Sequence, residues 1–213
     1  EFILKAQLTR GRSRRLSSNG VKLKTAGELA GILTTVLFCP EDLYLIREGG
    51  AARRRFLDGA ICQLRPRYAQ ALAEYNRLYE HKVRILRDWP ENPSLLETLD
   101  DFNLRLCQTG ALVIHYRAHF IKRLREEAPA IHQDFSGGRE VLELQYQTVS
   151  TVQDSFASPQ KIFGWLLEHQ ESHRRAELDS RQCLTGPHKD DVLVLLDGQS
   201  AKTYGSQGQT RTA

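Results

Sequence analysis

The sequence contains no methionine, few cysteines and no long apolar run. Its four cysteines are widely spaced without a Cys-x-x-Cys pair, which argues against a disulfide framework and a zinc cluster and fits a reducing cytosol. A membrane helix needs roughly 18 consecutive apolar residues. The chain has no such run, and its N-terminus lacks the basic and apolar regions of a signal peptide. We therefore expect a cytoplasmic protein that does not enter a membrane.

A nucleotide-hydrolysing site is also missing from the sequence. A phosphate-binding P-loop reads Gly-x-x-x-x-Gly-Lys-Ser/Thr, and no such string occurs. No general base can be named, so we assign no catalytic residue. The chain begins at Glu1 and stops at Ala213, just after an expected helix start, which predicts an interior fragment of a longer protein.

Histidine pairs with metal-ligand spacing occur twice, but neither completes a known site. His115 and His119 are four residues apart, as are His169 and His173. A zincin helix needs Glu directly after the first His, and neither pair has it. Because no third ligand is in view, we predict no metal site.

The overall composition is that of a soluble globular protein. With 213 residues, 40% of them hydrophobic and 26% charged, the chain predicts one or two domains with a real core. Its net charge of +4 permits nucleic-acid binding without requiring it.

Periodicity and turn signals predict both strands and helices. Apolar residues that alternate indicate half-buried strands, and apolar residues that recur at three and four positions indicate amphipathic helices. Asn19-Gly20 and Asp197-Gly198 are typical of type I′ hairpins, the second leading back toward Tyr204. Strands are expected at residues 2–9, 14–18, 21–24, 36–39, 142–146 and 192–196, and helices after Pro40 and at residues 51–64, 66–87, 102–129 and 159–181. The two longest helices should lie antiparallel.

Arginines crowd the first expected turn. Arg12, Arg14 and Arg15 stand there within four residues of one another. A solvated loop tip and a contact with the phosphate backbone of DNA are equally good interpretations, because a contact that does not read sequence needs no more than this.

Two further charged strings invite an assignment. At least one residue of Arg53-Arg54-Arg55 should be structural, paired with an acid such as Asp58 or Glu41, since three adjacent arginines spread around most of a helix. Asp190 and Asp191 should point to opposite faces of a strand entrance and share no ion, and pairing with the backbone or Lys189 is expected.

A short polar string near the end has the chemistry of a phosphate contact. Ser206, Gln207, Gly208 and Gln209 follow the second hairpin and open an expected helix. This order places a capping hydroxyl and several free backbone N–H groups at one point. A polar loop has the same composition, so the string alone does not decide.

Four strings, in this order, carry a resemblance to the RecF family, whose members have an SMC/ABC-type ATPase head. They are Phe-Cys-Pro-Glu-Asp-Leu at 38–43, Arg-Arg-Arg-Phe-Leu-Asp at 53–58, Gly-Pro-His-Lys-Asp-Asp at 186–191 and Ser-Gln-Gly-Gln at 206–209. The resemblance covers nearly the whole chain, and the last two strings are its most specific part.

The resemblance implies a fold and a division of the chain. The fold class is α/β, a partial SMC/ABC-type ATPase head with antiparallel β hairpins and an inserted helical subdomain. Residues 1–39 would belong to an ATPase head lobe, 40–135 to the helical subdomain and 136–213 to a truncated lobe with the ABC signature motif.

The resemblance also implies a function. It predicts an ATP-dependent DNA-binding recombination mediator in DNA repair, replication-fork recovery and the SOS response to DNA damage. ATP and Mg²⁺ would be cofactors of the complete protein, a weak ATPase, and the fragment alone would bind and hydrolyse none. Expected partners are DNA at single-strand/double-strand junctions, RecR, RecO and a second copy in an ATP-dependent homodimer.

The same resemblance suggests roles for individual residues. Ser206, Gln207, Gly208 and Gln209 would cap the nucleotide held by the partner protomer. Glu41 and Asp42 stand where ABC-type heads carry the Q-loop, which senses the metal and the γ-phosphate usually through a Gln that this stretch lacks. The alternative for these two acids is a first helical turn, where the helix dipole favours them.

Two other functions remain open at this point. One is a non-catalytic helical binding module in which Ser206 is only a helix cap. The other is a different SMC-like ATPase head, which would need sustained heptads in the 66–127 region, where Pro90 and Pro93 interrupt them.

Overall fold

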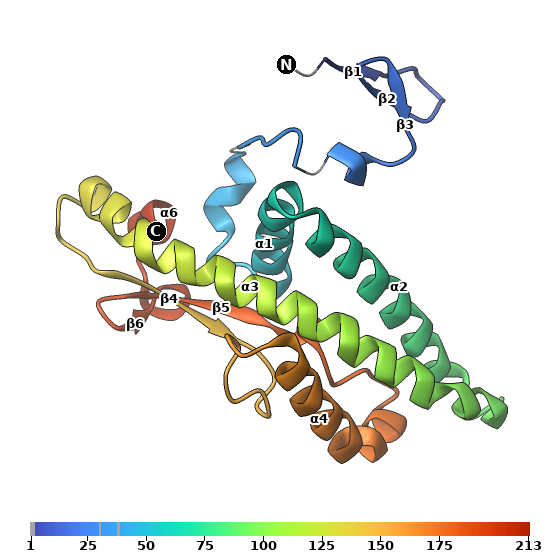
Figure 1. The fold of residues 1–213 in the computed structure, drawn as a ribbon. Coiled ribbons are helices and arrows are strands. Elements are labelled where there is room, and N and C mark those ends of the chain that lie inside the picture. Colours follow the sequence, from blue (N-terminus) through green and yellow to red (C-terminus); the bar gives the residue numbers. More distant parts are fainter. Residues whose placement is uncertain (1–2, 30, 38) are drawn as a thin grey trace.

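The computed structural model describes residues 3–29, 31–37 and 39–213. A long helix, α3 (Leu99–Ser136), runs through the main body, with α2 (Pro66–Asp88) and α4 (Pro159–Ser180) packed against it (Figure 1). The chain is α/β, with two small antiparallel sheets, as predicted.

The first sheet stands at the N-terminal end, away from the main body (Figure 1). It contains β1 (Leu4–Gln7), β2 (Arg15–Ser18) and β3 (Val21–Leu23) in that order. Asn19 and Gly20 both have positive φ, 49° and 83°, as a type I′ turn requires. The hairpin predicted from Asn-Gly is confirmed.

The second sheet lies against α3 and contains β4 (Leu142–Gln147), β5 (Asp191–Leu196) and β6 (Gln199–Ser200). Its hairpin turn at Asp197-Gly198 also has two positive φ values, 49° and 76°. The returning strand is only two residues long, because α5 (Ala201–Tyr204) follows at once. The chain reaches Tyr204 as a helical turn, and then α6 (Gln207–Thr212) begins.

The remaining helices largely follow the sequence pattern. The turn η2 (Pro40–Tyr44) begins with proline, and α1 (Gly50–Leu64) and α2 follow. A 3-10 turn, η3 (Pro93–Thr98), leads into α3, while η1 (Ala26–Leu29) and η4 (Pro187–Lys189) are short 3-10 turns in the connections. The prediction that the second long helix ends at Pro129 is wrong, since α3 continues to Ser136 and ends at Gly137 with a φ of 66°.

One predicted strand is absent. A buried strand is expected at residues 36–39, but Val36 and Leu37 are 101% and 80% exposed and form no strand. Phe38 lies outside the described residues. No described strand lies beside this segment to pair with it, so its apolar residues stay at the surface.

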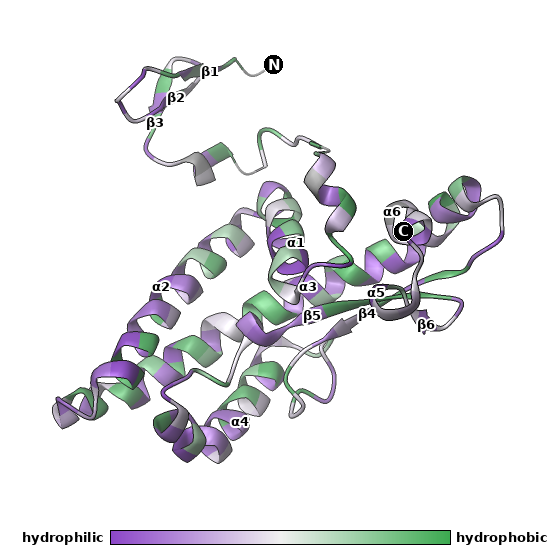
Figure 2. Ribbon diagram, turned by 180° about the vertical axis from the view of Figure 1, so that it is seen from behind, coloured by the Kyte–Doolittle hydropathy of each residue, from purple (hydrophilic) through white to green (hydrophobic). Residues whose placement is uncertain are grey.

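The core lies where α1, α2 and α3 meet β5. It includes buried side chains from each of these elements: Leu57, Ile61, Tyr68, Tyr75, Leu78, Leu106, Val113, Ile121 and Val192. Hydrophilic and hydrophobic residues are interleaved along α2 and α4 (Figure 2), as in amphipathic helices. Burying one large apolar side chain stabilises a fold by about 1.5–3 kcal/mol, so this cluster joins the helices firmly to the sheet.

Candidate functional site: the helix that begins after Ser206

Ser206 caps α6 as the sequence predicted. Its hydroxyl accepts a hydrogen bond from the Gln209 backbone N–H at 3.2 Å, and the Gln209 side-chain oxygen accepts from the Ser206 N–H at 2.7 Å. This reciprocal pair is a capping box. Ser206, Gln207 and Gly208 are exposed, and the first N–H groups of the helix have no acceptor within it.

A buried threonine anchors α6 to the rest of the chain. Thr210 is 5% exposed, and its hydroxyl donates to the Ser206 carbonyl at 3.1 Å. The same oxygen accepts from Arg47 Nε at 3.2 Å. Arg47 follows η2, which packs directly on α6. The helix that begins with the 206–209 string is therefore held in place by its contacts with the 40–48 segment.

Asp42 acts locally in this structure. Its carboxylate accepts from the Cys39 backbone N–H at 2.7 Å, which caps the first turn of η2. This contact agrees with the helix-start interpretation of the acid. The side chain of Glu41 lies outside the described part of the chain.

Arg53 joins the 45–48 loop to β5. Its Nη1 donates to the carbonyls of Leu45, Ile46 and Glu48 at 3.2, 2.8 and 2.7 Å. Its Nε and Nη2 form a two-pronged pair with the Asp191 carboxylate at 2.7 and 2.8 Å. These contacts lower the pKa of Asp191 against the opposing effect of its partial burial.

The other two arginines of the string have lesser contacts. Arg54 Nη1 donates to the Asp190 carbonyl at 2.6 Å, while Arg55 forms an exposed pair with Glu48 at 3.9 Å. The prediction of a structural arginine paired with an acid is confirmed, and the acid that pairs with Arg53 is Asp191. The two family strings at 53–58 and 186–191 thus bind each other.

Asp190 points the other way, toward α3. Arg117 is 3% exposed and bridges Asp190 at 2.9 Å and Asp58 at 2.9 Å, and it also donates to the Pro187 carbonyl at 2.7 Å. Tyr146 donates to the same Asp190 carboxylate. Burial raises the pKa of Asp190, and Arg117 opposes that shift.

The sequence predicted pairing of the two aspartates with the backbone or with Lys189. The backbone alternative is found at Asp191, whose carboxylate accepts from the Val192 N–H at 2.7 Å, whereas Asp190 pairs with Arg117 rather than Lys189. The opposite orientation of the two carboxylates is confirmed.

His188 is held neutral between aromatic rings. Its Nε2 donates to the Cys183 carbonyl at 2.9 Å, so Nδ1 accepts from the Tyr75 hydroxyl at 2.7 Å. The Tyr79 ring centroid lies 4.5 Å from that of His188. Burial lowers the pKa of His188 to about 4. Its role in the described chain is structural, because both ring nitrogens are engaged.

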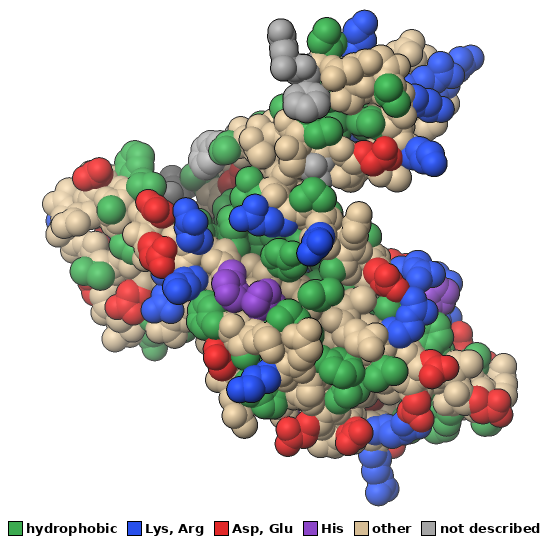
Figure 3. Space-filling model, in the orientation of Figure 1, with side chains coloured by type: hydrophobic (Ala, Val, Ile, Leu, Met, Phe, Trp, Pro, Cys, Tyr) green, Lys and Arg blue, Asp and Glu red, His purple; other side chains and the backbone are tan. Residues whose placement is uncertain are grey.

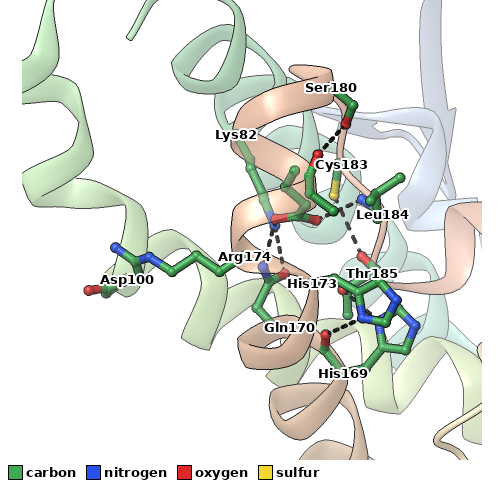
Figure 4. A network of polar contacts seen from close by, with 12 residues as sticks. Lys82, Asp100, His169, Gln170, His173, Arg174, Ser180, Cys183, Leu184 and Thr185 are labelled. Atoms are coloured by element: carbon green, nitrogen blue, oxygen red, sulfur yellow. Dashed lines mark hydrogen bonds and ion pairs between the residues drawn. The ribbon is translucent and has the colours of Figure 1, made fainter. Parts of the chain in front are cut away.

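A buried ion pair holds the segment that leads into this string (Figure 4). Lys82 Nζ lies 2.6 Å from both the Glu177 carboxylate and the Gln170 side-chain oxygen. The other Glu177 oxygen accepts from the Leu184 backbone N–H at 2.7 Å. Lys82 and Glu177 are almost fully buried, so helices α2 and α4 are fixed to the chain just before residue 186.

The predicted DNA-contacting arginines stand apart from α6. Arg12, Arg14 and Arg15 are exposed on the N-terminal sheet and its first turn. Lys and Arg side chains gather along the outer edge of this sheet (Figure 3). Arg12 and Arg15 line one hollow there with Gln7 and Thr9. The structure brings Arg12 and Arg15 to one hollow, and it places the N-terminal sheet away from α6 (Figure 1).

The described residues can also be checked for a metal-binding cluster and for a membrane-spanning helix. No three His, Cys, Asp or Glu side chains of that part gather closely enough to hold a metal ion. None of its helices is long and apolar enough to cross a membrane.

Known proteins match this chain over its whole length. No family model matches it. The chain is 36% identical over 213 residues to the DNA replication and repair protein RecF of Agathobacter rectalis, covering 56% of that protein, and 34% identical over 203 residues to RecF of Acetivibrio thermocellus, covering 55%. Over its whole length, the chain resembles part of RecF. It spans about half the length of the curated relatives that it matches.

Solved RecF structures agree with the fold. One, of the recombination mediator protein RecF with ATPrS in the RecFOR pathway, superposes with a TM-score of 0.90 at 27% identity, over 99% of this chain and 56% of the other. A second, of RecF with ATP, gives 0.83 at 28% identity with the same coverage. The resemblance to RecF drawn from four short strings is confirmed.

Sequence reasoning missed the residues that hold the RecF strings together. Arg117 and Lys82 lie on helices that read as ordinary amphipathic helices, and Arg47 carries no motif. A weak signal was present, because Arg117 and Lys82 fall among core positions of their helical stripes, where an unpaired charge would be costly.

Proposed function

We propose that this chain is part of a RecF-like, ATP-dependent DNA-binding recombination mediator that acts in DNA repair and replication-fork recovery in the cytoplasm. The observation that carries the proposal is the match of nearly the whole chain to solved structures of RecF with ATP and with ATPrS. In the complete protein ATP and Mg²⁺ would be the cofactors, and turnover would be slow.

The proposed role of this chain is to cap a nucleotide held by a second copy. The exposed start of α6 supports that role, because Ser206 and the following N–H groups face outward and the capping box fixes their geometry. Thr210 and Arg47 hold the helix in place. ATP would thereby join two heads, and the dimer would be the DNA-binding state.

DNA at single-strand/double-strand junctions is the proposed substrate, and RecR and RecO are the proposed partners. The names of both solved RecF structures include the RecFOR pathway, which supports the choice of partners. The exposed arginines of the N-terminal sheet support a contact with phosphates.

The proposal is tested with the full-length protein and a fluorescent DNA junction. We expect ATP to tighten binding to the junction, measured by fluorescence anisotropy, relative to the same protein without nucleotide. Binding that is equally tight with and without ATP would contradict an ATP-dependent mediator.

The arginine contact has its own test in the same assay. Changing Arg12, Arg14 and Arg15 together to Ala should weaken binding to all DNA sequences alike. The slope of log affinity against log salt should become shallower by about one unit for each phosphate that is no longer neutralised. Arg77, Arg84 and Arg87 on α2, changed together to Ala, provide a control with the same loss of charge. An unchanged slope in the first variant would mean that Arg12, Arg14 and Arg15 are solvated and do not contact DNA.

A further inference from the structure

The two histidine pairs of equal spacing have different geometries in the folded chain. His115 and His119 lie one turn apart on α3, with ring centroids 4.2 Å apart and planes inclined at 45°. His169 and His173 lie on α4 with centroids 3.9 Å apart and planes inclined at only 6°. Equal spacing in sequence therefore does not give equal capacity to bind an ion.

Backbone carbonyls set the tautomer of the first pair. His115 Nδ1 lies 3.0 Å from the Ala157 carbonyl oxygen, and His119 Nδ1 lies 2.9 Å from the His115 carbonyl oxygen. A carbonyl oxygen only accepts, so each Nδ1 carries the proton. In the neutral rings each Nε2 then carries a lone pair. This is the arrangement of metal-ligating histidines, which donate their other N–H to a carbonyl or carboxylate.

Aromatic neighbours hold both rings in place. The His119 ring meets the edge of Phe156 with centroids 5.7 Å apart, and the His115 ring meets Tyr116 at 6.1 Å. His115 is half-buried and His119 is exposed, so an ion in water has access. Two nitrogens that bind one tetrahedral ion at about 2.1 Å stand roughly 3.4 Å apart, which rings with this separation and tilt allow.

The second pair lacks this geometry. Its rings are almost parallel, so their lone pairs lie in parallel planes and do not converge on one point. His169 is 6% exposed, and burial lowers its pKa and keeps it neutral inside the protein. Its Nδ1 is engaged with the Thr185 hydroxyl at 2.8 Å.

The geometry points to a divalent transition-metal site formed by the Nε2 atoms of His115 and His119. Imidazole nitrogens suit Zn²⁺, Ni²⁺ and Cu²⁺. No third protein ligand is present among the described residues, so water would fill the other coordination positions. Because His115 also bonds the Ala157 carbonyl, the ion would strengthen the contact between α3 and the chain just before α4. None of these residues belongs to the proposed nucleotide or DNA contacts.

The test is a titration of the untagged 213-residue chain with Ni²⁺ by isothermal calorimetry. We expect one Ni²⁺ per chain, and binding at least about tenfold weaker in His119→Asn, since loss of even an outer-shell partner costs about 10–100-fold. The matched control His173→Asn should bind as the unchanged chain does. Ni²⁺ should raise the melting temperature of the unchanged chain and of the control but not of His119→Asn.

The outcomes separate clearly. Melting curves without metal show that each variant is folded, and His119→Gln serves if the asparagine variant is not. Undiminished affinity in the folded His119 variant, or loss of the ion in His173→Asn alone, would overturn the assignment. Failure of the full-length protein to bind DNA with ATP would leave this result untouched, because the site does not depend on the proposed function.

Discussion

Arg53 and Arg117 determine how the family strings of this chain meet. Each makes several charge-assisted bonds, Arg53 to Asp191 and three carbonyls, and Arg117 to Asp58 and Asp190. A buried guanidinium is tolerable only when such partners replace water. Asp190 thus pairs with Arg117 of α3, and Asp191 pairs with Arg53 of α1. Because both carboxylates are engaged in these ion pairs, neither is available as a metal ligand.

Removing the Arg117 side chain should destabilise the chain strongly. Arg117→Met leaves two carboxylates without their cation, one of them fully buried, which costs about 3–5 kcal/mol. Arg105→Met is the control, since its pair with Glu74 is exposed and such pairs contribute about 0–1 kcal/mol. Urea unfolding followed by circular dichroism measures both, and equal losses in the two variants would refute the buried network.

Because of His188, the free energy of unfolding should decrease as the pH falls into the mildly acidic range. Its pKa is about 4 in the fold against 6.5 for the free side chain, so the unfolded chain binds the proton first as the pH falls. Stability from this group is present above about pH 6.5 and is lost as the pH falls toward 4, with a slope of up to about 1.4 kcal/mol per pH unit.

His188→Gln removes that slope. The free energy of unfolding, measured by urea at several pH values, should fall less steeply between about pH 6.5 and 4 in the variant than in the unchanged chain. Other titrating groups are common to both proteins and cancel in the difference. Identical slopes would mean that His188 is not held neutral.

At the level of elements, η2 packs on α6, and a side-chain hydrogen bond joins the 40–48 segment to this helix. We expect Arg47→Ala and Thr210→Val to be coupled, because Arg47 Nε and the Thr210 hydroxyl lie 3.2 Å apart. A double-mutant cycle on the free energy of unfolding should give a coupling of about 0.5–1 kcal/mol. Strictly additive losses would show that the bond does not form in solution.

Helices and hairpins of this chain were predictable, since their signals are local. Apolar spacing located α1, α2 and α4, and two Asn/Asp-Gly turns located both hairpins. The prediction that α3 ends at Pro129 failed because α3 packs along much of its length. That packing outweighs the one backbone hydrogen bond that proline removes. The prediction of a strand at residues 36–39 failed because a short apolar run forms a strand only where a neighbouring strand can pair with it.

The site was predictable in its motifs but not in its contacts. Ser206 and its capping box follow from four adjacent residues. The partners of Asp190 and Asp191 lie 73 and 138 positions away, so no local pattern identifies them. Only folding brings residues 53–58 and 186–191 together.

At the scale of the whole molecule, this chain covers about half of each RecF relative that it matches. Phosphoryl transfer needs a P-loop, a Mg²⁺ site and a positioned water. The sequence has no P-loop, so we expect the purified 213-residue chain to release no phosphate from ATP above a buffer blank in a sensitive phosphate assay. Turnover by the chain alone would contradict the proposed dependence on residues outside it.

The central claim is that the start of α6 meets a nucleotide held by another protomer. Ser206→Arg in the full-length protein replaces the exposed capping hydroxyl with a bulky cation. Ser94→Arg makes the same change at an exposed residue of η3. The connection between α2 and α3, to which η3 belongs, lies at the opposite end of α3 from α6 (Figure 1). Removal of a cap alone costs about 1 kcal/mol and lowers only the melting temperature.

Equilibrium sedimentation with and without ATP, beside nucleotide-binding and thermal-melt controls, measures the effect. The account predicts that Ser206→Arg still binds ATP as a monomer but no longer dimerises, whereas Ser94→Arg dimerises on ATP as the unchanged protein does. A Ser206→Arg protein that dimerises on ATP as well as the Ser94→Arg control would contradict it.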